Sequence, residues 1–93
     1  MSVIQKIVLD ILKPHQPNAA DFALAIVEAG IDYKVYLSVI EVDESTESLR
    51  VEIQADDINF EQVQTIIKGL GASIHSVDEV HACNLKVNSA LGN

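Results

Sequence analysis

The segment of residues 73–83, SIHSVDEVHAC, gathers many of the side chains in this sequence that could carry chemistry. It holds two of the three histidines, two carboxylates and the single cysteine, which are His75, His81, Asp78, Glu79 and Cys83. Imidazole, carboxylate and thiolate groups all bind first-row metal ions. If the segment is a regular strand, both histidines, Glu79 and the cysteine lie on one face. The segment is therefore a candidate binding site, although it contains no familiar metal-binding motif.

Two residues near the amino terminus, Asp10 and His15, could complete such a site. The candidate ligand or metal-binding residues are then Asp10, His15, His75, Asp78 and Glu79, and an alternative metal set is His81 with Cys83. The surplus of carboxylates suits a weakly held hard cation such as calcium, whereas imidazole and thiolate together suit zinc. The competing interpretation is that these polar side chains lie on a solvated strand and bind nothing.

An enzyme would need a general acid or base in a pocket. Asp10 and His75, if they were paired across neighbouring strands, would form an oriented imidazole. A cross-strand hydrogen bond at a subunit contact explains the same pair without catalysis. We therefore favour a non-enzymatic protein and assign no catalytic residue.

Composition narrows the range of partners. Fourteen acidic against six basic residues give a net charge of −8, which disfavours binding to nucleic acid or to an anionic membrane, since phosphate binding needs a basic surface. The longest apolar run covers the six residues 22–27, which is too short to span a membrane. The amino terminus lacks the pattern of a signal peptide, and one cysteine cannot form an intramolecular disulfide. We expect a cytoplasmic protein.

The pattern of apolar residues predicts four strands and two helices. Alternating segments indicate strands, and the helices are indicated by apolar stripes that follow the predicted caps Asn18 and Asn59. The expected strands cover residues 3–12, 32–42, 48–55 and a last segment from about residue 72, and the expected helices cover residues 19–29 and 59–70.

This order predicts an α+β fold of the ferredoxin-like type, βαββαβ, over a single domain of residues 1–93 with a loose tail from about residue 84. Right-handed crossovers place the strands in the order 4-1-3-2, all antiparallel, with both helices on one face. The last strand then lies beside the first. A register that pairs Asp10 with His75 would also pair Lys6 with Glu79.

Several motifs resemble a known family. They are LDILKPHQP at residues 9–17, IHSVDEV at residues 74–80, the acidic hairpin VDESTE and the segment ADDINFEQV. In this order and spacing they are similar to family 211 of the domains of unknown function (DUF211), over nearly the whole chain up to about residue 87. The resemblance implies a ferredoxin-like fold and multi-subunit assemblies, and it implies no activity.

Apolar residues beyond the needs of one core predict self-association. The outward face of the sheet would expose Ile4, Val8, Leu12, Tyr36, Ile40 and Val77, and the first helix would add Leu24 and Ala25. Monomers seldom leave such patches open. We expect a homo-oligomer larger than a dimer, which binds a divalent cation or a small ligand at subunit contacts. The alternatives are a cofactor-independent enzyme with an intersubunit Asp/His pocket and a protein-interaction adaptor.

The cation hypothesis predicts a measurable stabilisation. If carboxylates of the hairpin or the last strand hold an ion, calcium or zinc should raise the Tm in proportion to the logarithm of free ion concentration. Substitution of Glu79 or His75 should remove that shift. Thermal unfolding at increasing ion concentration is the measurement, and a curve that stays unchanged up to millimolar ion would contradict the hypothesis.

Overall fold

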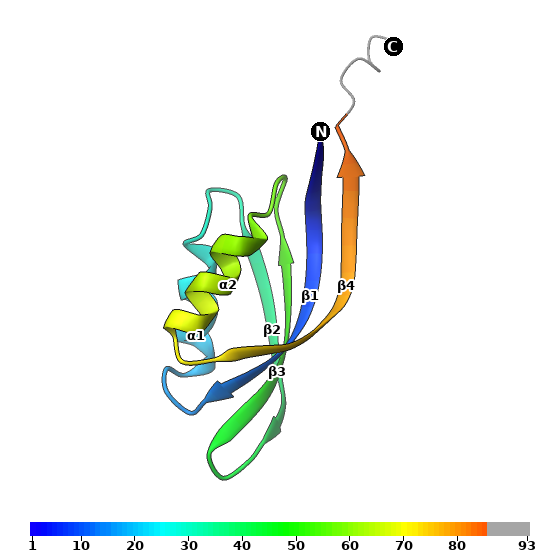
Figure 1. The fold of residues 1–93 in the computed structure, drawn as a ribbon. Helices are drawn as coiled ribbons and strands as arrows, with labels where there is room; N and C mark the ends of the chain where they lie inside the picture. Colours follow the sequence, from blue (N-terminus) through cyan, green and yellow to red (C-terminus); the bar gives the residue numbers. More distant parts are fainter. Residues whose placement is uncertain (86–93) are drawn as a thin grey trace.

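A computed structural model gives the fold and describes residues 1–85 (Figure 1). Its elements in chain order are β1 (Ser2–Pro14), α1 (Ala19–Val27), β2 (Lys34–Val42), β3 (Thr46–Gln54), α2 (Phe60–Gly69) and β4 (Ser73–Asn84). The predicted order βαββαβ is therefore confirmed. The predicted tail from about residue 84 lies outside the described residues, apart from Asn84, which is the last residue of β4, and Leu85.

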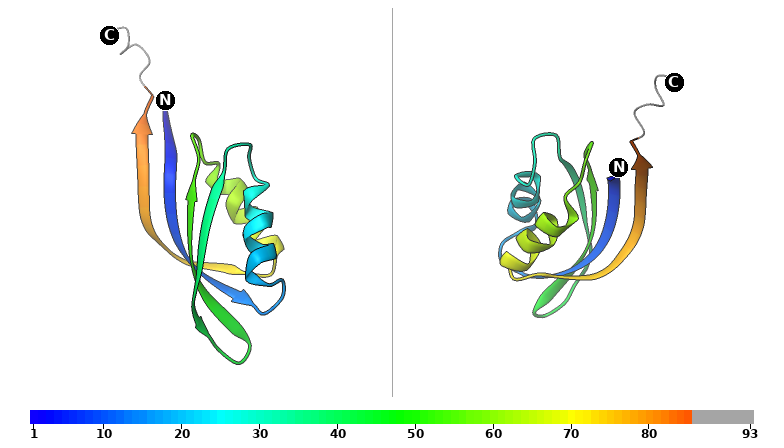
Figure 2. Two further views of the ribbon diagram at one scale, coloured as in Figure 1. Left: turned by 180° about the vertical axis from the view of Figure 1, so that it is seen from behind. Right: turned by 45° about the horizontal axis from the view of Figure 1, so that its top comes forward.

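The four strands form one antiparallel sheet in the order β2-β3-β1-β4. This is the predicted order 4-1-3-2 read from the opposite edge. Both helices lie on the same face of the sheet, as the views in Figures 1 and 2 show. The ferredoxin-like α+β fold is confirmed.

Local chemistry fixes where the helices begin. The side chain of Asn18 accepts a hydrogen bond from the Asp21 amide, and that of Asn59 accepts one from the Gln62 amide. Each bond satisfies an amide that has no partner within the helix. Both predicted caps are therefore confirmed.

The core lies between the helices and the central strands. Leu49, Val51 and Ile53 of β3 are fully buried, as their alternation predicted. They form one cluster with residues of β1 and both helices, including Ile7, Leu9, Ile11, Phe22, Ile26, Val63 and Ile67. Phe60 is only partly buried and packs at the margin of this cluster.

The register between β1 and β4 differs from the prediction. Asp10 lies opposite Ser76 and Ile11 lies opposite Ile74, so His75 is an extra residue without a partner on β1. A second shift leaves Asp78 unpaired in the same way. Each bulge adds one residue to β4 and moves the rest of the strand along its neighbour. The predicted pairing of Asp10 with His75 is therefore wrong.

The outward face of the sheet is less apolar than expected. Val8 is only 2% exposed, since it lies on a central strand between the long side chains of Glu52 and Glu79. A register shift at Gln5 separates Ile4 from this row, and Ile4 is partly buried against the core. The expectation that Ile4 and Val8 are exposed is therefore wrong.

The other large apolar side chains of this prediction are exposed, whereas Ala25 on α1 is only partly exposed. Leu12, Tyr36, Ile40, Val77 and, on α1, Leu24 all have accessible side chains. Val77 lies opposite Leu9 and thus on the helix side of the sheet, not on its outward face, because of the bulge at Asp78.

The buried position of Ile53 predicts a large loss of stability on truncation. Ile53→Ala should lower the free energy of unfolding by about 2–5 kcal/mol, because it leaves a cavity between β3 and the helices. Ile31→Ala, which removes the same atoms from a fully exposed side chain, is the matched control and should change it little. Denaturant unfolding measures both, and similar losses in the two variants would contradict the assigned core.

Candidate functional site

The predicted site residues are spread over several places in the fold. Four of them lie on or near the outward face of β1 and β4, two occupy the bulges of β4, and His15 lies in the connection between β1 and α1. Within residues 1–85, no three His, Cys, Asp or Glu side chains lie close enough together to hold a metal ion. The calcium or zinc site remains a prediction.

Glu79 is the centre of one cluster. Its Oε2 lies 3.1 Å from the ammonium of Lys6 and 2.7 Å from Nε2 of His81. Hydrogen bonds from Lys6, which has the larger effect, and from His81 lower the pKa of Glu79 below its ordinary value. The expected Lys6–Glu79 pair thus forms, although Lys6 lies opposite His81 in the register and reaches Glu79 diagonally.

The remaining β4 candidates have few partners. Asp78 accepts a hydrogen bond of 2.6 Å from the Ser76 hydroxyl. His75 is exposed at its bulge, and the exposed Cys83 makes only a long contact of 3.8 Å to the Asn84 carbonyl. Asp10 lies between Arg50 and Ser76 in the register. These residues do not converge on one point.

A second cluster surrounds Lys13, whose side chain is 0% exposed. Its ammonium donates to the backbone carbonyls of Pro14 at 2.8 Å and Pro17 at 2.6 Å, with a longer contact of 3.4 Å to that of His15. A carboxylate oxygen of Glu47, on β3, lies 3.0 Å away. A charge removed from water is tolerated only when such partners surround it. We refer to Lys13, His15 and Glu47 as the Lys13 cluster.

Glu47 joins the two cationic groups of this cluster. Its Oε1 contacts Lys13, and its Oε2 lies 3.0 Å from Nδ1 of His15. The hydrogen bonds from His15 and then from Lys13 lower the pKa of Glu47. The same bond to Glu47, which has the larger effect, and a second bond to the Glu44 carbonyl raise the pKa of His15 above its ordinary value of 6.5.

Sequence reasoning missed Lys13 and Glu47. The predicted first strand ends at residue 12, one residue before Lys13, because Pro14 and Pro17 indicate a connection that stops the strand. A signal was nevertheless present, since Lys13 continues the inward alternation of Ile7, Leu9 and Ile11 along β1. Glu47 lies directly opposite Lys13 on β3, so the two side chains lie on the same face of the sheet.

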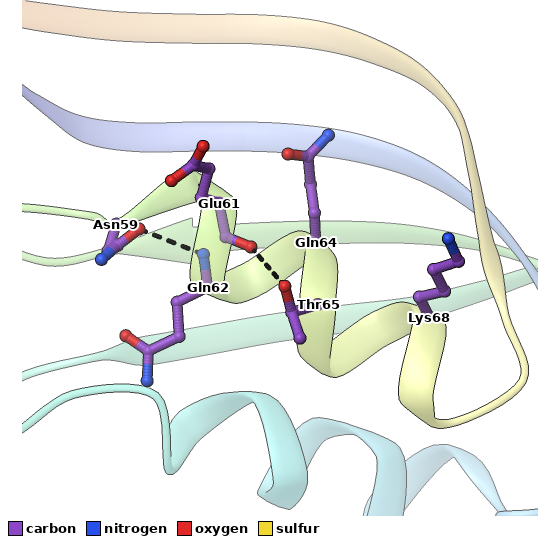
Figure 3. A pocket seen from close by; sticks show the side chains of 6 residues that line it. All are labelled: Asn59, Glu61, Gln62, Gln64, Thr65 and Lys68. Carbon is purple, nitrogen blue, oxygen red and sulfur yellow. Dashed lines mark hydrogen bonds between the residues drawn. The ribbon is translucent and has the colours of Figure 1, made fainter.

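A surface hollow along α2 shares no residue with either cluster. It is lined by Asn59, Glu61, Gln62, Gln64, Thr65 and Lys68 (Figure 3). Two of these side chains bond to the helix itself, since Asn59 caps the Gln62 amide and the Thr65 hydroxyl donates to the Glu61 carbonyl. The hollow is thus the polar side of a surface helix.

Comparison with known proteins gives one family. The family model DUF211, described as "Uncharacterized ArCR", matches residues 5–90. An uncharacterised protein of Methanocaldococcus jannaschii is 44% identical over 82 residues, which cover 88% of this chain and 84% of the relative. Neither α1 nor α2 is long and apolar enough to cross a membrane, and no other helix is present in residues 1–85.

The buried ammonium of Lys13 predicts a strong dependence of stability on this side chain. Lys13→Met keeps much of the apolar stem but leaves Glu47 and the loop carbonyls without their donor, which should reduce the free energy of unfolding by about 3–5 kcal/mol. Lys6→Met is the matched control, because the ion pair of Lys6 is partly exposed and should contribute far less. Denaturant unfolding of the two variants gives the comparison, and equal losses would contradict a buried, interior role for Lys13.

Proposed function

The chain belongs to the DUF211 family, and we propose that it is a non-enzymatic, cytoplasmic protein whose copies assemble into a closed homo-oligomer larger than a dimer. The observation that carries this proposal is a mismatch between the two layers of the fold. The strands are much longer than the helices that cover them, so parts of the sheet have no cover from their own chain.

The mismatch follows from element lengths. β1 and β4 contain 13 and 12 residues, and each spans about 40 Å at about 3.3 Å per residue. α1 and α2 contain nine and ten residues and span only about 15 Å at about 1.5 Å per residue. In both Figures 1 and 2, the carboxyl end of β4 and the tip of the β2–β3 hairpin extend past the helices in opposite directions.

Apolar side chains lie at both uncovered ends. On β4, Val77 and Val80 lie on the helix side of the sheet and are 45% and 48% exposed. On the hairpin, Val39 and Val42 lie on the same side and are 43% and 64% exposed. Covering such surfaces is favourable by about 25 cal/mol per Å² of apolar area. In an isolated chain this apolar area stays in contact with water and the stabilisation is not gained.

Two free sheet edges add hydrogen-bonding capacity. β2 and β4 are the outer strands, and an outer strand presents unpaired amides and carbonyls to a partner chain. The bulges at His75 and Asp78 interrupt the first half of β4, whereas its pairing with β1 shows no extra β4 residue between Glu79 and Asn84. The regular half of this edge is therefore the half that extends beyond α2.

The arrangement of these surfaces favours a ring. The hairpin tip and the free end of β4 are different surfaces at opposite ends of the molecule (Figure 1). A contact between unlike surfaces is head-to-tail, and when its rotation closes it produces a ring of more than two copies. The outward sheet face contributes less than expected, since it carries Lys6, Glu79, Arg50 and Glu52.

The divalent cation expected at the subunit contacts is part of this proposal, and the positions of several carboxylates support it. The exposed carboxylates of the hairpin, Asp43 and Glu44, and Asp78 on β4 lie at or near the surfaces proposed to meet. A contact between copies would bring them closer together. The alternative of an Asp/His enzyme loses its geometric basis within this chain, because Asp10 and His75 are not paired.

The proposal predicts that single charges at the uncovered ends disrupt the assembly. Ile40→Glu and Val80→Glu should each convert the oligomer to smaller species, because they place a charge in an apolar contact, while thermal unfolding of the separated chain remains cooperative. Native mass spectrometry and sedimentation give the number of copies and report any bound ion.

Gln62→Glu is the control, since it adds the same charge on the exposed side of α2 and should leave the assembly intact. A wild-type protein that sediments as a 10.1 kDa monomer at micromolar concentration would overturn the proposal. A stable complex with a different copurifying chain in place of self-assembly would do the same and would support the adaptor alternative.

A further inference from the structure

The imidazole of His15 faces a hydrogen-bond acceptor on each side. Its Nδ1 lies 3.0 Å from the Glu47 carboxylate and its Nε2 lies 2.9 Å from the backbone carbonyl of Glu44. An ionised carboxylate and a carbonyl only accept hydrogen bonds, and a neutral imidazole has only one N–H to donate. With Glu47 ionised, both contacts are satisfied together only when both ring nitrogens carry a proton.

A second arrangement, with the proton on Glu47 and a neutral imidazole, would also satisfy both contacts, but Lys13 disfavours it. A protonated Glu47 could donate to a neutral Nδ1, which would leave Nε2 free to donate to Glu44. The second oxygen of Glu47, however, lies 3.0 Å from the buried ammonium of Lys13, and an adjacent cation favours the ionised carboxylate. The cluster therefore holds one carboxylate between two cations.

These contacts tie the tip of the β2–β3 hairpin to the connection that follows β1. Glu47 belongs to β3 and Glu44 to the turn, whose ends are joined by the hydrogen bond from the Asp43 amide to the Thr46 carbonyl. The ring faces the carboxylate of Glu47 from β3, whose other oxygen contacts the ammonium of Lys13 from β1, and on the turn side it faces the backbone of Glu44 and Asp43. Loss of one ring proton removes one of the two bonds to the hairpin.

We infer that His15 is an imidazolium in the folded protein and acts as a proton-dependent clamp on the hairpin tip. The inference rests on the proposed function and extends it to regulation. The clamped hairpin tip carries Ile40 and Val42, two of the exposed apolar side chains of the proposed contact surface. A tip held in one conformation loses less entropy on binding. Release of the clamp at higher pH should therefore weaken the assembly.

The pH range follows from the directions of the pKa shifts. The pKa of His15 is raised, so its stabilisation is complete below the ordinary value of 6.5 and is lost as pH rises through the raised value. The pKa of Glu47 is lowered, so its stabilisation is complete above the ordinary value of 4.5 and is lost as pH falls through the lowered value. The clamp is complete between these two ordinary values.

The test of the clamp is nitrogen NMR of histidine-labelled protein, kept free of divalent ions by a chelator, together with amide hydrogen exchange. At about pH 6, both ring nitrogens of His15 should be protonated, and at about pH 9 only one should be. Over this range the Asp43 amide should lose protection severalfold beyond the intrinsic increase in exchange rate. His15→Gln should lack this additional change, and the control His81→Gln should retain it. A His15 ring with one proton at about pH 6, or an equal response in His15→Gln and wild type, would overturn the clamp.

Sedimentation of the same proteins separates the clamp from the assembly. A wild-type oligomer that dissociates between about pH 6 and about pH 9, with no such step in His15→Gln, would support the coupling. A monomer at both pH values with a doubly protonated His15 would overturn the proposed function and leave the clamp supported. An oligomer of constant size with a clamp that opens would overturn the coupling alone.

Discussion

An ammonium group that is cut off from water must find all its partners within the protein, and in this molecule that requirement falls on Lys13. The side chain continues the inward row of β1 past the end of the apolar core. Its donors are satisfied by the carbonyls of Pro14 and Pro17 and by Glu47. The connection to α1 is therefore wrapped around the ammonium, and the β2–β3 hairpin is fixed to it through Glu47. The path of the connection and the way the hairpin projects both depend on this one charge.

The second constraint is geometric and concerns the two layers. A strand gains about twice as much length per residue as a helix, so two short helices cannot cover a sheet built on strands as long as β1 and β4. The helices cover only the middle of the sheet, where Leu49, Val51 and Ile53 are fully buried. The two ends of the sheet remain open and carry valines. A surface of this kind is typical of a subunit.

The two charged clusters of this chain consist of ion pairs and hydrogen bonds among its own residues. Glu79 binds Lys6 and His81 on the outward face, and Glu47 binds Lys13 and His15 at the hairpin. In each cluster one carboxylate lies between two basic groups. Such clusters position strands and loops, and at His15 the arrangement also makes the hairpin contact depend on a proton. The charged residues around Glu47 thus hold the hairpin, which carries one of the proposed contact surfaces, in position.

The amino-acid sequence by itself determined the order of elements, both helix caps and the inward face of β3, because these follow from local periodicity and from short-range hydrogen bonds. It also determined the strand order, because crossover connections are right-handed. The exposed positions Leu12 and Tyr36 also followed from the alternation, whereas Ile40 is exposed at a register shift of β2. Only the tertiary structure decided the register of β4, since a bulge at His75 or Asp78 depends on how two distant strands meet and not on either strand alone. For the same reason the burial of Val8, the position of Val77 on the helix side and the partners of Lys13 did not follow from the pattern. Each depends on a neighbour that is distant in the chain, and the position of that neighbour is set by the packing of the whole domain.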